Sequence, residues 1–135
     1  MFDRPFFPGN KIHLDFILAT HMHYDHAGNF ETIIRSEKVV IDKAYIKEYT
    51  DDDFSETEKI GWGNQELYTA IITALNEKEV PIIHDLPTEE FSFGDFTLRL
   101  LNTVTPDEIK VGGDNDNSIG VIVKKGEDSA FLAAD

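Results

Sequence analysis

Three of the five histidines in this chain fall within six consecutive positions. Residues 21–26 read HMHYDH, a spacing of H-x-H-x-D-H. In an extended backbone His21 and His23 point to the same side, so their imidazoles can bind one metal ion. Where the chain then turns into a helix, Asp25 and His26 become neighbours that can reach a second ion. Two adjacent cations can polarise a scissile group and lower the pKa of a shared water molecule, which is hydrolytic chemistry.

The composition limits which ions such a site can hold. The chain contains no cysteine, so thiolate ligands and disulfides are excluded. Ligands drawn from histidine, aspartate and glutamate suit two divalent ions in an open catalytic centre, with Zn²⁺ preferred and Mn²⁺ or iron as alternatives. A histidine-rich surface loop, or the remnant of a degenerate site, would show the same pattern without binding metal.

The residues around the motif predict the elements that position it. An apolar stretch at 13–20 predicts a buried strand that leads directly into the motif, and Asn29 is placed to cap a short helix over 30–37. The remaining predicted elements are a strand or strand pair at 38–49, a solvated acidic loop at 50–59, a helix at 64–78, an edge strand at 80–86, and hairpins at 89–102 and 118–135 with turns at Gly94–Asp95 and Lys125–Asp128. Hairpins mixed with amphipathic helices predict one layered α/β domain.

The motif after a buried strand resembles the signature of the metallo-β-lactamase superfamily of two-metal hydrolases, and the resemblance covers nearly the whole chain. It implies a layered αββα sandwich. It also implies that His21 and His23 bind one ion, whereas Asp25 and His26 bind the other. In that superfamily an aspartate at the end of a later strand bridges both ions, and AFLAAD resembles that strand, with Asp135 as the bridge. Asp25 would also accept a hydrogen bond from the metal-bridging hydroxide.

Longer segments carry a narrower resemblance within the superfamily. LDFILATHMHYDHAGN, AYIKEYTD, FSFGDFTLRLLN and DNDNSIGVIV together resemble the catalytic module of pneumococcal teichoic-acid phosphorylcholine esterase. The DNDNS block and the final strand are also similar to the hydrolase domain of bacterial DNA-uptake channel proteins. These resemblances imply a small-molecule or cell-wall phosphodiester substrate, such as a choline-phosphate ester, and an extracellular or cell-surface location.

The chain departs from the superfamily pattern in two places. Many members carry a further histidine ligand in a G-H-x-x-G-S-like stretch, where this chain has GGDNDNS and Asp114 takes the histidine position. Asp114 or Asp116 could bind metal through oxygen, or Asn117 could hold a water molecule, but the same composition is typical of a turn. Members also begin with upstream strands and continue past the bridging aspartate to a last histidine. Residues 1–135 therefore read as a single partial domain, incomplete at both ends.

The charge of the chain bears on its partners. There are 26 acidic and 12 basic residues, for a formal net charge of −14, so no nucleic-acid partner is expected. No stretch approaches the roughly 18 apolar residues of a membrane span, and residues 1–11 do not resemble a signal peptide. An incomplete sandwich would expose apolar sheet surface, which predicts self-association.

Four other features could take part in binding but have plainer interpretations. His13 is expected at the end of its strand remote from the motif, and His84 is interpreted as a surface or hydrogen-bonded histidine. Trp62 and Tyr68 could form an aromatic cage for a quaternary ammonium group, although core or interface packing is preferred. The segment at 51–56 lacks the glycine and terminal glutamate of a calcium loop.

The preferred interpretation is a binuclear metal-dependent hydrolase of phosphodiester bonds. A metal-binding but catalytically silent fragment or interaction domain is the first alternative, because the chain lacks some of the ligands of the superfamily. The second alternative keeps the enzyme but changes the bond to a lactone, a thioester or a β-lactam.

Overall fold

The computed structural model describes residues 11–103 and 117–134. The strands are β1 (Ile12–Leu14), β2 (Ile17–Leu18), β3 (Val39–Ile41), β4 (Ala44–Tyr45), β5 (Ile82–Ile83), β6 (Phe91–Phe93), β7 (Phe96–Leu101), β8 (Gly120–Lys125) and β9 (Asp128–Leu132). The helices are α1 (Tyr24–Ala27), α2 (Phe30–Arg35) and α3 (Asn64–Glu77), with a 3₁₀ turn, η1 (Asp51–Asp53), and a short π-helix, η2 (Glu58–Trp62). This mixture confirms the predicted α/β class.

The first half of the chain forms parallel strands. β1 pairs with β3, and β2, β4 and β5 form a second parallel set in that order. The predicted single strand at 13–20 is wrong in one respect, because a bend at Asp15 divides it into β1 and β2. The segment at 38–49 likewise forms two strands, which is one of the two forms predicted for it. β5 lies at the edge of its set, as predicted from Pro81.

The second half forms a four-stranded antiparallel sheet in the order β6-β7-β8-β9. Both predicted hairpins are confirmed, and their turns place Gly94 and Gly126 at positive φ, where glycine is favoured. β9 ends at Leu132, so the prediction that the last strand ends on Asp135 falls outside the described residues. Among the helices described, none is long and apolar enough to cross a membrane.

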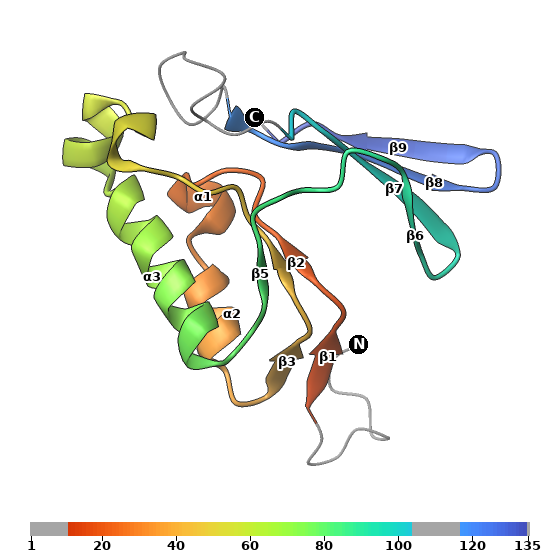
Figure 1. Cartoon of the computed structure of the whole chain (residues 1–135), viewed down its shortest axis with the longest axis horizontal. Coiled ribbons are helices and arrows are strands. Elements are labelled where there is room, and N and C mark those ends of the chain that lie inside the picture. The colour runs from red at the N-terminus through yellow and green to blue at the C-terminus, as the bar shows by residue number, and fades with distance from the viewer. Residues whose placement is uncertain (1–10, 104–116, 135) are drawn as a thin grey trace.

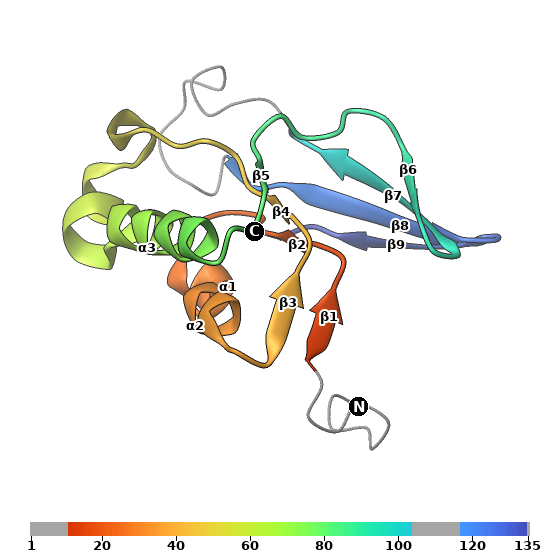
Figure 2. The same cartoon turned by 60° about the horizontal axis from the view of Figure 1, so that its bottom comes forward.

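The parallel strands form the middle of three layers (Figures 1 and 2). Consecutive residues of β4 face opposite ways, so Ala44 packs in the core beneath the helices and Tyr45 in the core against the antiparallel sheet. The helix-side core is centred on Ile34, Ile41, Ile46, Leu67, Ile71 and Leu75. The sheet-side core is formed by Tyr45, Leu86, Leu98, Leu100, Ile119 and Val121. A second helical layer, as in αββα, does not occur within residues 11–103 and 117–134.

The helices cover one face of the parallel strands. α3 matches the predicted helix at 64–78, and Leu67, Ile71 and Leu75 point into the core at the predicted spacing. Asn29 occupies the N-cap position of α2 as predicted, but its side chain makes no capping hydrogen bond. On the surface, Arg35 of α2 forms an ion pair with Glu77 at the C-terminal end of α3.

Candidate metal centre

The H-x-H-x-D-H motif begins directly after β2, at the carboxyl end of the parallel strands. α1, η2 and the start of α3 lie at this same end of the molecule (Figure 1). The segment that enters β8 also reaches it, because the Ile119 amide donates to the Thr20 carbonyl at 3.0 Å. Loops at the carboxyl ends of parallel strands are where open α/β sheets place their ligands. The fold therefore brings the motif to an edge suited to a functional site.

The three histidines of the motif lie together. The ring centroid of His21 is 4.9 Å from that of His23 and 4.2 Å from that of His26. His21 is fully buried, while the side chains of His23 and His26 are 12% and 31% exposed. The exposure of the three histidines therefore increases from His21 in the protein interior to His26 near solvent. Met22 points the other way, into the helix-side core.

Asp25 and His26 are neighbours in the first turn of α1, as predicted. The Nε2 atom of His26 lies 3.6 Å from an Asp25 carboxylate oxygen. The Asp25 side chain is 78% exposed and therefore faces the solvent side of the cluster. Asp114 and Asp135, predicted as a further ligand and as the bridging ligand, fall outside the described residues, as does Asp116.

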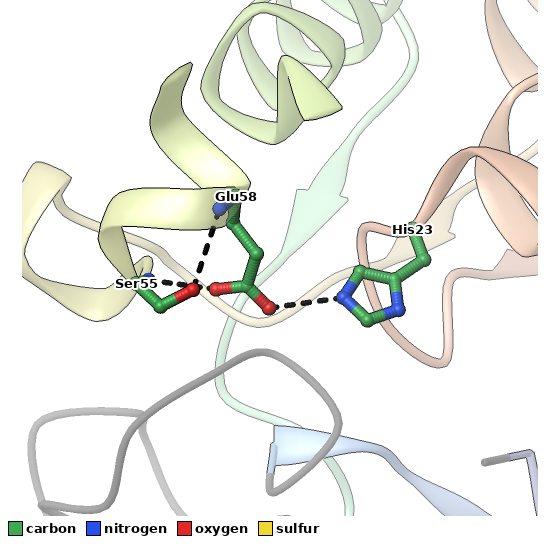
Figure 3. Close-up of polar contacts among 3 residues, drawn as sticks. All are labelled: His23, Ser55 and Glu58. Atoms are coloured by element: carbon green, nitrogen blue, oxygen red, sulfur yellow. Dashed lines mark hydrogen bonds and ion pairs between the residues drawn. The ribbon is translucent and has the colours of Figure 1, made fainter. Parts of the chain in front are cut away.

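Glu58 is the acidic residue that packs against the motif. Its carboxylate is 3% exposed, and its Oε1 atom accepts a hydrogen bond from His23 Nε2 at 2.9 Å (Figure 3). Its Oε2 atom accepts the Ser55 amide at 2.7 Å, and the Glu58 amide donates to Ser55 Oγ at 3.3 Å. The prediction of a solvated loop at 50–59 is therefore wrong at its C-terminal half. The reciprocal pair is a capping box, whose Ser-x-x-Glu signature was legible in the sequence.

Two exposed aromatic rings border the cluster. The Trp62 ring lies edge-on to His23, with centroids 5.3 Å apart, and the Trp62 side chain is half exposed. Tyr24 is similarly exposed beside Gly63. Core packing of Trp62 is wrong, since its side chain lies on the surface, whereas interface packing stays a prediction. Tyr68 instead packs on Tyr49 in the interior, where burial raises the pKa of its hydroxyl.

A buried cation lies beneath the same edge. Lys47, which follows β4, is 2% exposed, and its ammonium group donates to the Asn117 carbonyl at 2.8 Å. Nothing in the sequence singled out this lysine, because a lone lysine in a strand-forming segment carries no pattern that predicts its burial. The contact fixes the start of β8 against the parallel strands. It therefore sets where the segment after residue 116 meets the motif.

The donor chemistry of the motif fits divalent transition metals. Three imidazoles and a carboxylate supply nitrogen and oxygen ligands that suit zinc, manganese or iron. Within the described residues the motif does not bring three ligand atoms within 4.8 Å of one another, whereas His13, Asp15 and Asp42 do so. That second group is exposed and lies on β1 and the bend after β3, remote from the motif as predicted for His13. Within this second group, His13 is already hydrogen-bonded to Asp42 at 2.8 Å.

The remaining predicted histidine, His84, is not part of the cluster. Its Nδ1 atom is hydrogen-bonded to the Ile46 carbonyl at 2.9 Å, which agrees with the prediction of a surface or hydrogen-bonded histidine. Comparison with known proteins adds nothing to this geometry: the sequence matches no protein-family model and no curated protein.

Proposed function

We propose that the chain is a metal-dependent hydrolase with two divalent ions, preferably Zn²⁺, whose substrates are phosphodiesters. The observation that carries the proposal is the gathering of His21, His23 and His26 at the carboxyl edge of the parallel strands, with a buried carboxylate on the second of them. Structural zinc sites are usually closed by four protein ligands, whereas this cluster is open to solvent on one side. An open site leaves room for a substrate.

Each residue of the motif has a distinct role in this proposal. His21 and His23 hold one ion, and Asp25 and His26 hold the other from the solvent side. Asp135 is proposed to bridge the ions, on the strength of the sequence resemblance alone. Bound cations would supply Lewis acidity and a nucleophilic water at neutral pH. The preference for phosphodiesters, including choline-phosphate esters, rests on the resemblance as well, and Trp62 and Tyr24 offer a surface for the leaving group.

Metal content and hydrolysis together test the proposal. The protein purified without chelator should contain close to two transition-metal ions per chain. It should hydrolyse p-nitrophenyl phosphorylcholine faster than p-nitrophenyl acetate or a chromogenic β-lactam. The double variant His21→Ala/His23→Ala should lose both metal and activity. His84→Ala is the matched control, because it removes a histidine that lies outside both the motif and the group formed by His13, Asp15 and Asp42. Activity that persists in the double variant, or a preference for the carboxylic ester, contradicts the proposal.

A metal-binding but catalytically silent domain is the second candidate. It is favoured by the high exposure of Asp25 and by the spacing of the described ligand atoms, which is wider than in a compact site. This candidate predicts bound metal that the double variant loses, with no hydrolysis of any of the three substrates. Metal stoichiometry near two with turnover would exclude it.

A further inference from the structure

We infer that Glu58 is a positioning residue for the metal centre: it holds the His23 imidazole with its proton on Nε2, which leaves Nδ1 as the nitrogen that binds metal. The inference rests on the proposed metal site but not on the nature of the reaction. It assigns a role to an acid that lies 35 positions from His23 in the sequence. It also specifies which of the two ring nitrogens of His23 is the ligand.

The hydrogen bond between Glu58 and His23 determines the tautomer. An ionised carboxylate has acceptors only, so the ring nitrogen that faces it must carry the hydrogen. With a hydrogen on Nε2, a neutral His23 has its lone pair on Nδ1. In Figure 3 this second nitrogen lies on the side of the ring away from Glu58.

Glu58 is held in place independently of His23. Its second oxygen accepts the Ser55 amide and its own amide donates to Ser55 Oγ, so the capping box fixes the carboxylate at the start of a helix. The side chain is 3% exposed, and water therefore competes little for these bonds. Trp62, at the end of the same π-helix, packs against the ring of His23. Short π-helices of this kind occur frequently at functional sites.

A carboxylate behind a metal-binding histidine has a known physical effect. It fixes the tautomer and the ring orientation, and it raises the basicity of the nitrogen that faces the metal. Removing such a partner costs roughly 10–100-fold in metal affinity. The geometry at Glu58 fits this role, because its hydrogen bond to His23 has an ordinary length of 2.9 Å, is nearly buried, and starts from a carboxylate that the Ser55 amide also holds.

Glu58→Gln is the most informative variant, because its neighbours fix which way the side-chain amide of the new Gln is oriented. The Ser55 amide can only donate, so it keeps the amide oxygen of Gln on its own side. The NH₂ group of Gln then faces His23 and donates to Nε2. His23 must accept, and its hydrogen moves to Nδ1, the nitrogen proposed to bind metal. Glu56→Gln is the matched control. It removes the same charge two positions earlier in the chain, and the Glu56 side chain is 81% exposed.

Two measurements test the inference. Long-range ¹H–¹⁵N NMR on the metal-free protein at pH 8 should show the Nε2–H tautomer of His23 in the wild type and in Glu56→Gln, and the Nδ1–H tautomer in Glu58→Gln. Competition for Zn²⁺ with a chromophoric chelator should show affinity about 10–100-fold lower in Glu58→Gln and unchanged in the control. An Nδ1–H tautomer in the wild type would overturn the inference, and so would Zn²⁺ affinity of Glu58→Gln within twofold of the wild type.

These results are separable from the proposed function. If no substrate is hydrolysed but the tautomer and the Zn²⁺ affinity respond as expected, the positioning role stands and the hydrolase proposal fails. If hydrolysis is found but the wild type carries the Nδ1–H tautomer, the hydrolase stands and this inference fails. The wild-type tautomer requires no variant, so a folding defect in Glu58→Gln leaves the decision intact.

Discussion

His13 lies between two carboxylates at the end of the parallel strands remote from the motif. Its Nε2 atom is 2.8 Å from Asp42, and its Nδ1 atom is 4.0 Å from Asp15. The hydrogen bond to Asp42, reinforced by the charges of both carboxylates, raises the pKa of His13 above its usual 6.5. The group is fully exposed, so solvent screens the interaction strongly and its effect on stability is small.

The direction of the pH dependence follows from that shift. Because the folded-state pKa is raised, the stabilisation is fully present below pH 6.5 and is lost as the pH rises through the folded-state value. An NMR titration of the His13 ring should give a pKa above 6.5 that falls in Asp42→Asn, where only Asp15 still raises it. The His84 ring of the same sample serves as an internal control. An identical His13 midpoint in both proteins would contradict the assignment.

At the level of single residues, the sequence pattern located the histidine cluster but not the residues that pack against it. The dense cluster from His21 to His26 was visible because its spacing is rare. Glu58 was grouped with a solvated acidic run, since nothing in composition distinguishes one acid of such a run from another. Its capping-box spacing with Ser55 predicts a helix start, but only the fold shows that this start lies against His23. The burial of Lys47 could not be predicted either, because its partner Asn117 lies far away in the sequence.

Gly28 ends α1 and holds the second half of the motif in place. Its amide donates to the Tyr24 carbonyl at 2.9 Å, and a Cβ added there would lie 2.4 Å from that same oxygen. Backbone cannot yield as a flexible side chain does, so Gly28→Ala must displace α1. We expect a loss of about 1–3 kcal/mol in the free energy of unfolding. Zn²⁺ affinity should fall as well, because α1 carries Asp25 and His26.

Gly61→Ala is the matched control for this substitution. It lies in η2, where a Cβ would meet only Thr57 Cγ2 at 4.0 Å. We expect its free energy of unfolding to stay within about 0.5 kcal/mol of the wild type. Urea denaturation of both variants, followed by the chelator competition, makes the comparison. Equal stability of the two variants would show that α1 tolerates the added methyl group.

At the level of elements, hydrophobic periodicity and turn residues were reliable where the elements are long or sharply bounded. α3 and both hairpins lie where the sequence places them. The short elements were harder, because residues 13–20 contain enough apolar side chains for one strand, yet Asp15 bends the chain. Residues 50–62 were harder still. Their helical turns are specified by two capping boxes, at Thr50 and Ser55, and not by an apolar repeat.

At the level of the whole molecule, the layers follow from which faces are apolar. β2, β4 and β5 each contribute side chains to both cores, so these parallel strands must lie between the helices and the antiparallel sheet. That sheet covers them with Leu98, Leu100 and Val121. Its far end extends beyond the parallel strands (Figure 2), where every residue of β9 is exposed. The sequence predicted exposed apolar sheet surface, and its position on β9 became clear only from the strand order.

This exposed strand makes self-association an expected property of the chain. Phe131 and Leu132 are 59% and 57% exposed and lie on an edge strand, which presents both apolar surface and unpaired backbone groups. Sedimentation equilibrium of the wild type should give a mass that rises with concentration above 15.3 kDa. Phe131→Lys/Leu132→Lys should stay near that mass, because charge on an edge strand opposes pairing. Thr69→Lys, on the exposed side of α3, controls for the added charge, because it lies outside the antiparallel sheet. A wild type that is monomeric throughout, or a double variant that associates equally, would show that β9 is not the associating surface.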